Sequence, residues 1–129
     1  MAPPANLQYP YKDGHFLKVP KFSGKIYALT HSNPFIPLPY QETYRRVRTN
    51  WKGKKYEHIF KVCTNSTMKK DCGKWINVAN NKTVPFGKTT FDTYFGSPMI
   101  WNIKKYDAGV YMTGDRKHSI QVVLINGIL

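Results

Sequence analysis

The chain has 129 residues, which fits one domain, and no apolar run approaches the roughly 20 residues of a membrane-spanning helix. Aromatic residues make up 15% of it, and nine glycines and nine prolines interrupt it often, which favours short strands over long helices. Twenty Lys and Arg against seven Asp and Glu give a net charge of +13, a field that attracts polyanions without specifying which kind.

The N-terminal third contains few clear strand signals. Residues 1–14 are rich in proline and tyrosine, and we expect them to form an extended segment before a single domain over residues 15–129. Loose alternation of apolar and polar residues predicts strands at residues 15–22 and 24–30. Three prolines in residues 32–41 remove donors from any strand ladder, so this stretch is predicted to be a long loop.

The remainder of the chain shows stronger strand patterns. Strands are predicted at residues 43–51, 56–64, 73–78, 89–95, 98–103, 109–113 and 119–125. About seven to nine short strands with frequent turns are typical of an all-β, antiparallel β-sandwich. The chain ends on apolar residues after the last strand, and an uncovered edge there would allow a weak homodimer.

A short motif precedes the last strand. Asp107, Gly109 and Tyr111 (Asp-Ala-Gly-Val-Tyr) follow an apolar strand that carries Ile100 and Ile103. This region resembles the E–F corner of immunoglobulin-superfamily domains, where an Asp-x-Gly-x-Tyr-x-Cys motif closes the sandwich. The resemblance implies an immunoglobulin-like sandwich in which Gly109 permits the turn and the Tyr111 hydroxyl bonds the backbone upstream.

The sequence departs from this family at its core. Thr113 stands where the family places its second intersheet cysteine, and no cysteine occurs near Thr30, where the first would fall. We expect Thr30 and Thr113 to face each other in place of the bridge. Trp51 is the nearest candidate for the family's core tryptophan, with Trp75 and Trp101 as alternatives.

Two cysteines are too few for a disulfide scaffold and lack the companions of a zinc site. If the strands on either side of residues 65–71 pair, Cys63 and Cys72 meet near the tip, and we expect a disulfide there in an oxidising compartment. Asn65 and Asn81 begin glycosylation triplets in predicted loops, although about one such triplet is expected by chance. These features favour a secreted or cell-surface protein, and a cytoplasmic one with free thiols is the alternative.

Cationic and aromatic residues are concentrated in one predicted strand and turn. They predict a binding face for a protein or a sulfated or acidic glycan, made by Arg45, Arg46, Arg48, Trp51, Lys52, Lys54, Lys55 and Tyr56. We expect this face to be extended by the lysines that flank the two cysteines, Lys61, Lys69, Lys70 and Lys74. A solvated basic surface without a partner is the competing interpretation, and the absence of a nucleic-acid motif in the sequence disfavours nucleic acid.

No catalytic motif is present in the sequence, so we expect neither an enzyme nor a cofactor or metal site. Four histidines would permit a ribonuclease-like site only if two converged on one cleft. The sequence therefore predicts a non-enzymatic recognition domain. The alternative is an intracellular structural module, because immunoglobulin-like domains of muscle filaments often lack the intersheet bridge.

Overall fold

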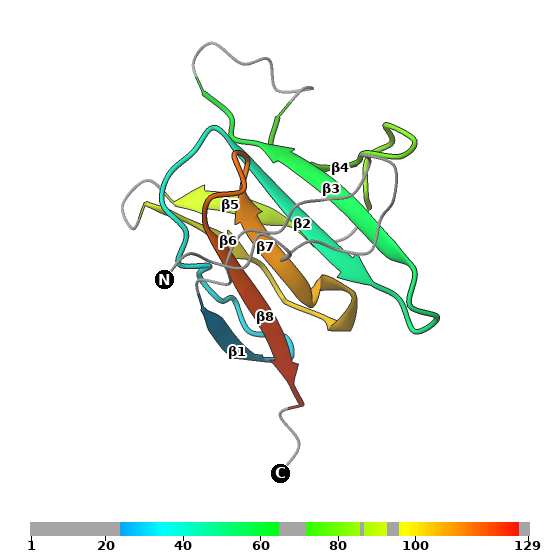
Figure 1. Ribbon diagram of the computed structural model, residues 1–129. Coiled ribbons are helices and arrows are strands. Elements are labelled where there is room, and N and C mark those ends of the chain that lie inside the picture. Colours follow the sequence, from blue (N-terminus) through cyan, green and yellow to red (C-terminus); the bar gives the residue numbers. More distant parts are fainter. Residues whose placement is uncertain (1–23, 65–71, 86, 93–95, 127–129) are drawn as a thin grey trace, which may run out of the picture.

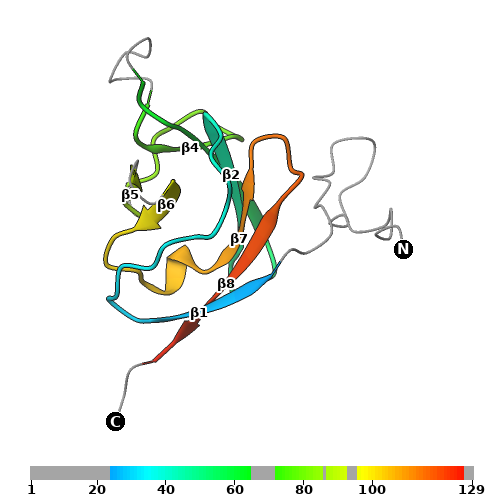
Figure 2. The same cartoon turned by 90° about the vertical axis from the view of Figure 1, so that its left-hand side faces the viewer.

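The computed structural model describes residues 24–64, 72–85, 87–92 and 96–126. Within these ranges eight strands form two sheets that face each other, so the domain is an all-β sandwich (Figures 1 and 2). The extended segment 1–14, the strand predicted at residues 15–22 and the triplet at Asn65 lie outside the described residues.

The larger sheet has six strands in the order β1-β8-β7-β2-β3-β4. Their bounds are β1 Lys25–Leu29, β2 Thr43–Thr49, β3 Lys55–Lys61, β4 Trp75–Asn77, β7 Gly109–Thr113 and β8 Ser119–Ile125. The smaller sheet pairs β5 Thr89–Asp92 with β6 Ser97–Ile100, and a 3-10 turn, η2 Lys105–Asp107, leads from β6 to β7. Every strand predicted within the described ranges is present, although several are shorter than expected.

One strand pair departs from the antiparallel pattern. β1 runs parallel to β8, from Lys25 opposite Gln121 to Leu29 opposite Ile125. The chain leaves β1 for the opposite sheet, where Phe35 bridges Met99, and so it does not turn back beside its neighbour. Because β1 pairs with β8, the last strand is not an edge of the sheet. The expectation of a weak homodimer rested on β8 being such an edge.

The proline-rich stretch is irregular, as predicted, yet it contributes to the core. Ile36 donates its amide to Pro98 O at 2.9 Å, and Ile100 donates to Pro34 O at 3.0 Å. Ile36 and Leu38 are buried while Phe35 and Pro37 are exposed, which is the alternation of a strand. The three prolines prevent a full ladder, so this segment lies beside β6 without becoming a regular strand.

Apolar side chains from both sheets fill the space between them. Tyr44 of β2, Phe60 of β3, Trp75 of β4 and Tyr111 of β7 are each 3% exposed or less. Among the tryptophans considered, Trp75 is therefore the one in the core. Trp51 is 88% exposed and was wrongly considered for that place, since it lies in a turn beyond the sandwich.

The corner before β7 has the predicted geometry. Tyr111 Oη donates to the carbonyl oxygen of Asp107 at 2.7 Å, and Asp107 Oδ2 accepts the amide of Lys104 at 2.9 Å. Thr113 is fully buried, but it does not face Thr30, contrary to expectation. Thr30 follows β1 and bonds the carbonyl of Ile125, because the chain crosses between the sheets only after it.

Gly109 sits where β7 passes closest to β2. Its φ is 155°, and a Cβ there would overlap the carbonyl oxygen of Val47. Gly53 also has positive φ, 85°, but a Cβ there would meet nothing within 4 Å. A side chain at Gly109 would therefore meet both backbone strain and steric overlap, whereas one at Gly53 would meet backbone strain alone.

We predict that Gly109→Ala lowers the free energy of unfolding by about 3 kcal/mol, because backbone strain and overlap add. Gly53→Ala, the matched control, should cost about 1 kcal/mol from strain alone. Urea unfolding of both variants and the parent measures the difference. Equal losses would show that β7 shifts away from β2 without cost.

Candidate functional site

The turn between β2 and β3 is held by one asparagine. Asn50 Oδ1 accepts the amides of Lys52 and Lys54, both at 2.9 Å. The backbone amide of Asn50 donates to Lys54 O at 2.8 Å, and the backbone amide of Gly53 donates to Asn50 O at 2.9 Å. These bonds fix the turn, so the side chains that it carries project from a defined backbone. We call residues 48–56 the hairpin tip.

Trp51 is the most exposed large aromatic side chain within the described ranges. At 88% exposure its indole stands in solvent, and Lys52 Nζ lies 4.9 Å from the ring centroid. Burial of an aromatic ring stabilises a fold, so a tryptophan left in water contributes little to folding. Its position on an ordered turn makes it available to a partner.

A second aromatic ring of the hairpin tip carries two cations. The guanidinium of Arg48 lies 5.6 Å and Lys54 Nζ lies 5.3 Å from the centroid of the half-buried Tyr56 ring. Lys55 Nζ donates to Thr49 Oγ1 at 3.2 Å. The structure therefore brings six of the eight predicted binding residues together: Arg48, Trp51, Lys52, Lys54, Lys55 and Tyr56.

Arg45 is placed differently. Its Nη1 lies 2.7 Å from Glu57 Oε2, which also lies 3.1 Å from Arg116 Nη2. Arg45 Nε donates to Gly114 O at 3.1 Å. This half-buried arginine is committed to partners on the sheet, so it contributes less to a binding face than the sequence predicted.

The prediction that Arg46 belongs to an exposed face is wrong. Arg46 is 1% exposed because its side chain points between the sheets, opposite to that of Arg45. Its Nε donates to His58 Nδ1 at 2.9 Å and its Nη1 donates to Tyr111 Oη at 3.2 Å. Asp107 Oδ1 lies 3.6 Å from Nη1, and the guanidinium lies 4.3 Å from the Trp75 ring centroid.

Gly87 completes this buried cluster. A Cβ at this position would overlap Asp107 Oδ1 and lie 2.6 Å from Arg46 Nη1. The backbone can therefore approach the ion pair only because the residue has no side chain. Sequence alternation could have assigned Arg46 to the face of Tyr44, but nothing local identified its partners.

Burial shifts the pKa values of the groups around Arg46. Desolvation, followed by the charges of Arg46 and Arg48, lowers the pKa of His58 to about 4, so its imidazole is neutral near pH 7. Desolvation raises the pKa of Asp107, against the opposing effects of the Lys104 amide and the nearby cations. Desolvation also raises the pKa of Tyr111, which keeps its hydroxyl protonated as a donor.

The described residues do not form the single positive face expected from the sequence, and Lys69 and Lys70 lie outside them. Lys55 begins β3 and Lys61 ends it, and Lys74 lies next to β4 beside the Lys61 end. Seven residues of strand separate these ends by roughly 20 Å. The hairpin tip and the pair formed by Lys61 and Lys74 are therefore two separate groups.

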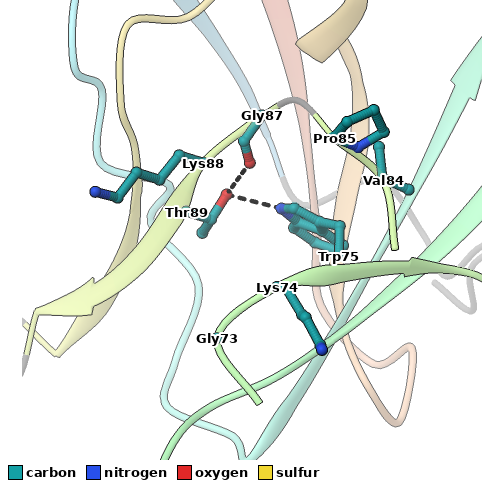
Figure 3. A pocket seen from close by; sticks show the side chains of 8 residues that line it. All are labelled: Gly73, Lys74, Trp75, Val84, Pro85, Gly87, Lys88 and Thr89. Atoms are coloured by element: carbon teal, nitrogen blue, oxygen red, sulfur yellow. Dashed lines mark hydrogen bonds between the residues drawn. The ribbon is translucent and has the colours of Figure 1, made fainter. Parts of the chain in front are cut away.

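Two small cavities open beside the edge between β4 and β5, which the sequence did not predict. One has a volume of about 240 Å³ and is lined by Trp75, Val84, Pro85 and Gly87, among others (Figure 3). There Trp75 Nε1 donates to Thr89 Oγ1 at 2.8 Å. The second, of about 240 Å³, has Phe60, Val62 and Phe91 in its wall. Both are small compared with most ligand sites.

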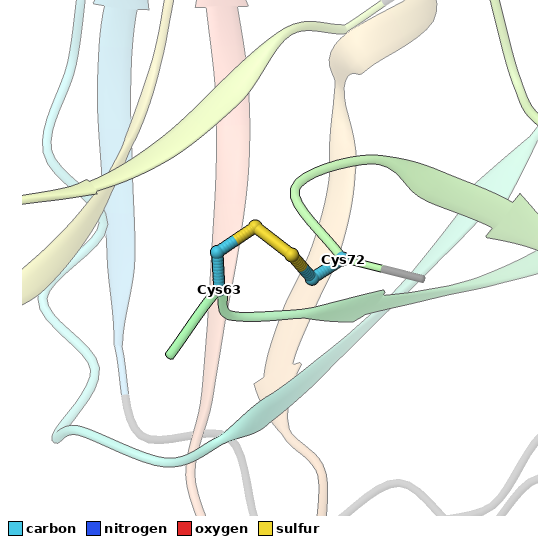
Figure 4. The surroundings of a disulfide bond; sticks show 2 residues. All are labelled: Cys63 and Cys72. Atoms are coloured by element: carbon cyan, nitrogen blue, oxygen red, sulfur yellow. A yellow bond between two sulfur atoms is a disulfide. The ribbon is translucent and has the colours of Figure 1, made fainter. Parts of the chain in front are cut away.

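The predicted disulfide is present beside the second cavity. Cys63 and Cys72 are bonded across the β3–β4 pair, with Cα atoms 5.0 Å apart (Figure 4). The antiparallel register brings them together, as expected. Asn81 is exposed in the turn after β4, and its glycosylation stays a prediction.

The described ranges hold no helix with the length and apolar character that a membrane crossing requires. In the same ranges, no three His, Cys, Asp or Glu side chains gather into a group that could hold a metal ion. Comparison of the chain with protein-family models, curated proteins and solved structures gives no match.

The neutral histidine beside Arg46 predicts a loss of stability in acid. In the unfolded chain His58 binds a proton near pH 6.5, whereas the folded protein excludes that proton until about pH 4. Between these values stability falls as pH falls, by at most about 1.4 kcal/mol per pH unit. The raised pKa of Asp107 acts in the opposite direction.

We predict that His58→Gln, which keeps an acceptor for Arg46, removes this part of the pH dependence. Urea midpoints at pH 7.5 and pH 5 should differ less for the variant than for the parent. Asp107 and the other acids are common to both proteins, so their effects cancel. Parallel pH profiles would contradict a neutral buried His58.

Proposed function

We propose that the chain is an immunoglobulin-like recognition domain of the variable type that binds an acidic macromolecule through the hairpin tip. Two additional strands on the larger sheet distinguish the variable type. In this assignment β8, β7, β2, β3 and β4 correspond to strands G, F, C, C′ and C″. The segment 34–38, β6 and β5 correspond to B, E and D.

The corner and the core support the assignment. The hydrogen bond from Tyr111 to the Asp107 carbonyl is the tyrosine corner of this fold. The absent intersheet bridge is a departure, and the buried cluster around Arg46 occupies the space between the sheets. β1, beside β8, would be the first strand of the domain.

The observation that carries the binding proposal is the exposure of Trp51 among cations on an ordered turn. Trp and Arg are the residues most often found at binding hot spots, and an ordered loop loses little freedom when it binds. The cations attract an acidic partner and the ring provides the contact that holds it. The partner would be an acidic protein or an acidic glycan.

The disulfide supports a secreted or cell-surface location. Such bonds persist in oxidising compartments and are rare in the cytosol. An intracellular filament module would keep Cys63 and Cys72 reduced, so the bonded pair favours the extracellular interpretation.

Expression through a eukaryotic secretory pathway tests this location. We predict no free thiol and a mass that falls on glycosidase treatment if Asn81 carries a glycan. Thr83→Ala, which destroys that triplet, should remove the part of the mass loss that comes from a glycan on Asn81. Two free thiols in protein isolated from its natural source would exclude the extracellular assignment.

Removing two positive charges near one end of β3, and two near its other end as a control, tests the binding site. We predict that Lys52→Gln/Lys54→Gln weakens binding to immobilised heparin or poly-L-glutamate by about five- to tenfold and flattens its salt dependence. Lys61→Gln/Lys74→Gln removes the same charge at the far end and should change affinity by less than about twofold.

Elution over a NaCl series measures both effects. Equal shifts for the two double variants would show that binding follows net charge alone. No shift for the hairpin variant would remove the hairpin tip as the site.

A further inference from the structure

The hairpin tip is poorly suited to a large protein interface. Such interfaces bury roughly 800 Å² on each partner, with an apolar core in which lysine is depleted. Within residues 48–56 the aromatic surface is limited to Trp51 and the half-buried Tyr56, and three of the nine residues are lysine. A partner that rests on this turn meets isolated rings and point charges.

The rings and the charges occur in pairs. Lys52 Nζ lies 4.9 Å from the ring centroid of Trp51, and Lys54 Nζ lies 5.3 Å from the ring centroid of Tyr56. Arg48 adds a guanidinium at 5.6 Å from the Tyr56 ring. Two aromatic planes, each beside a cation, are thus presented at one end of the β2–β3 hairpin.

An acidic polysaccharide has the complementary chemistry. Each sugar ring offers a face of C–H groups that can stack on an indole, and its sulfate or carboxylate groups point outward toward cations. Because rings and charges alternate along the polymer, one chain can engage an aromatic side chain and its neighbouring lysine together. Ammonium groups bind such anions as mobile point charges.

We infer that the hairpin tip binds a sulfated or carboxylated glycan, with Trp51 stacked on a sugar ring and Lys52, Lys54 and Arg48 paired with its anionic groups. This inference rests on the proposed function and names its partner class. Single-stranded nucleic acid also alternates rings and charges. The disulfide favours the glycan, because acidic glycans occur in the oxidising compartments where such bonds persist.

The test separates stacking from charge. We predict that Trp51→Ala weakens binding of a heparin hexasaccharide by at least about tenfold and leaves poly-L-glutamate binding within about twofold. Trp101→Ala is the control and should change neither, because this side chain is 42% exposed and bonds Thr90 of β5 on the smaller sheet. In the parent, hexasaccharide binding should shift the fluorescence of Trp51, and Trp51→Phe should keep affinity but lose that shift.

The other outcomes are distinct. Tighter binding of poly-L-glutamate, with equal losses for both polymers in Trp51→Ala, would overturn the glycan inference and leave an acidic protein as the partner. Tighter binding of oligothymidylate than of the hexasaccharide would overturn it in favour of nucleic acid. Binding of no probe, or binding unchanged by every hairpin variant, would contradict the proposed function itself.

Discussion

The buried guanidinium of Arg46 is the constraint on which much of the domain depends. Burying an arginine between two sheets is costly, and an opposite charge and hydrogen-bond acceptors nearby offset much of that cost. Here the guanidinium donates hydrogen bonds to His58 of β3 and to Tyr111 of β7. Asp107 of η2 supplies the opposite charge, and the ring of Trp75 of β4 lies against the guanidinium. One side chain therefore ties together four strands and the corner in a sandwich without an intersheet disulfide.

This inward arginine also determines what remains for the surface. Alternation along β2 directs Arg46 into the core and Arg45 to the outer face, where Glu57 pairs with it. The other cations of this run lie toward the turn, around Trp51 and Tyr56. Neighbouring basic residues therefore have three different places in the fold. Arg46 lies in the core, Arg45 forms a surface ion pair, and the others lie at the hairpin tip.

Local patterns were sufficient to predict most of the strands, the β3–β4 disulfide and the corner at Tyr111, because each depends on residues close together in the chain. The partners of Arg46 could not be predicted, since Asp107 lies 61 residues away along the chain. The parallel pairing of β1 with β8 also depends on tertiary contacts. Six of the eight expected binding residues gather at the hairpin tip, since a tight turn keeps sequence neighbours together in space.

Gly87 shows how far the buried cluster restricts the sequence. Any side chain there would enter the space of Arg46 and Asp107. A chain that replaced Arg46 with a smaller, uncharged residue would no longer need the opposite charge of Asp107 and would gain room beside Gly87. Among proteins that share this fold, the three positions are therefore expected to change together during evolution, although Arg46 lies on β2 of the larger sheet and Gly87 lies in the segment that leads into β5 of the smaller one.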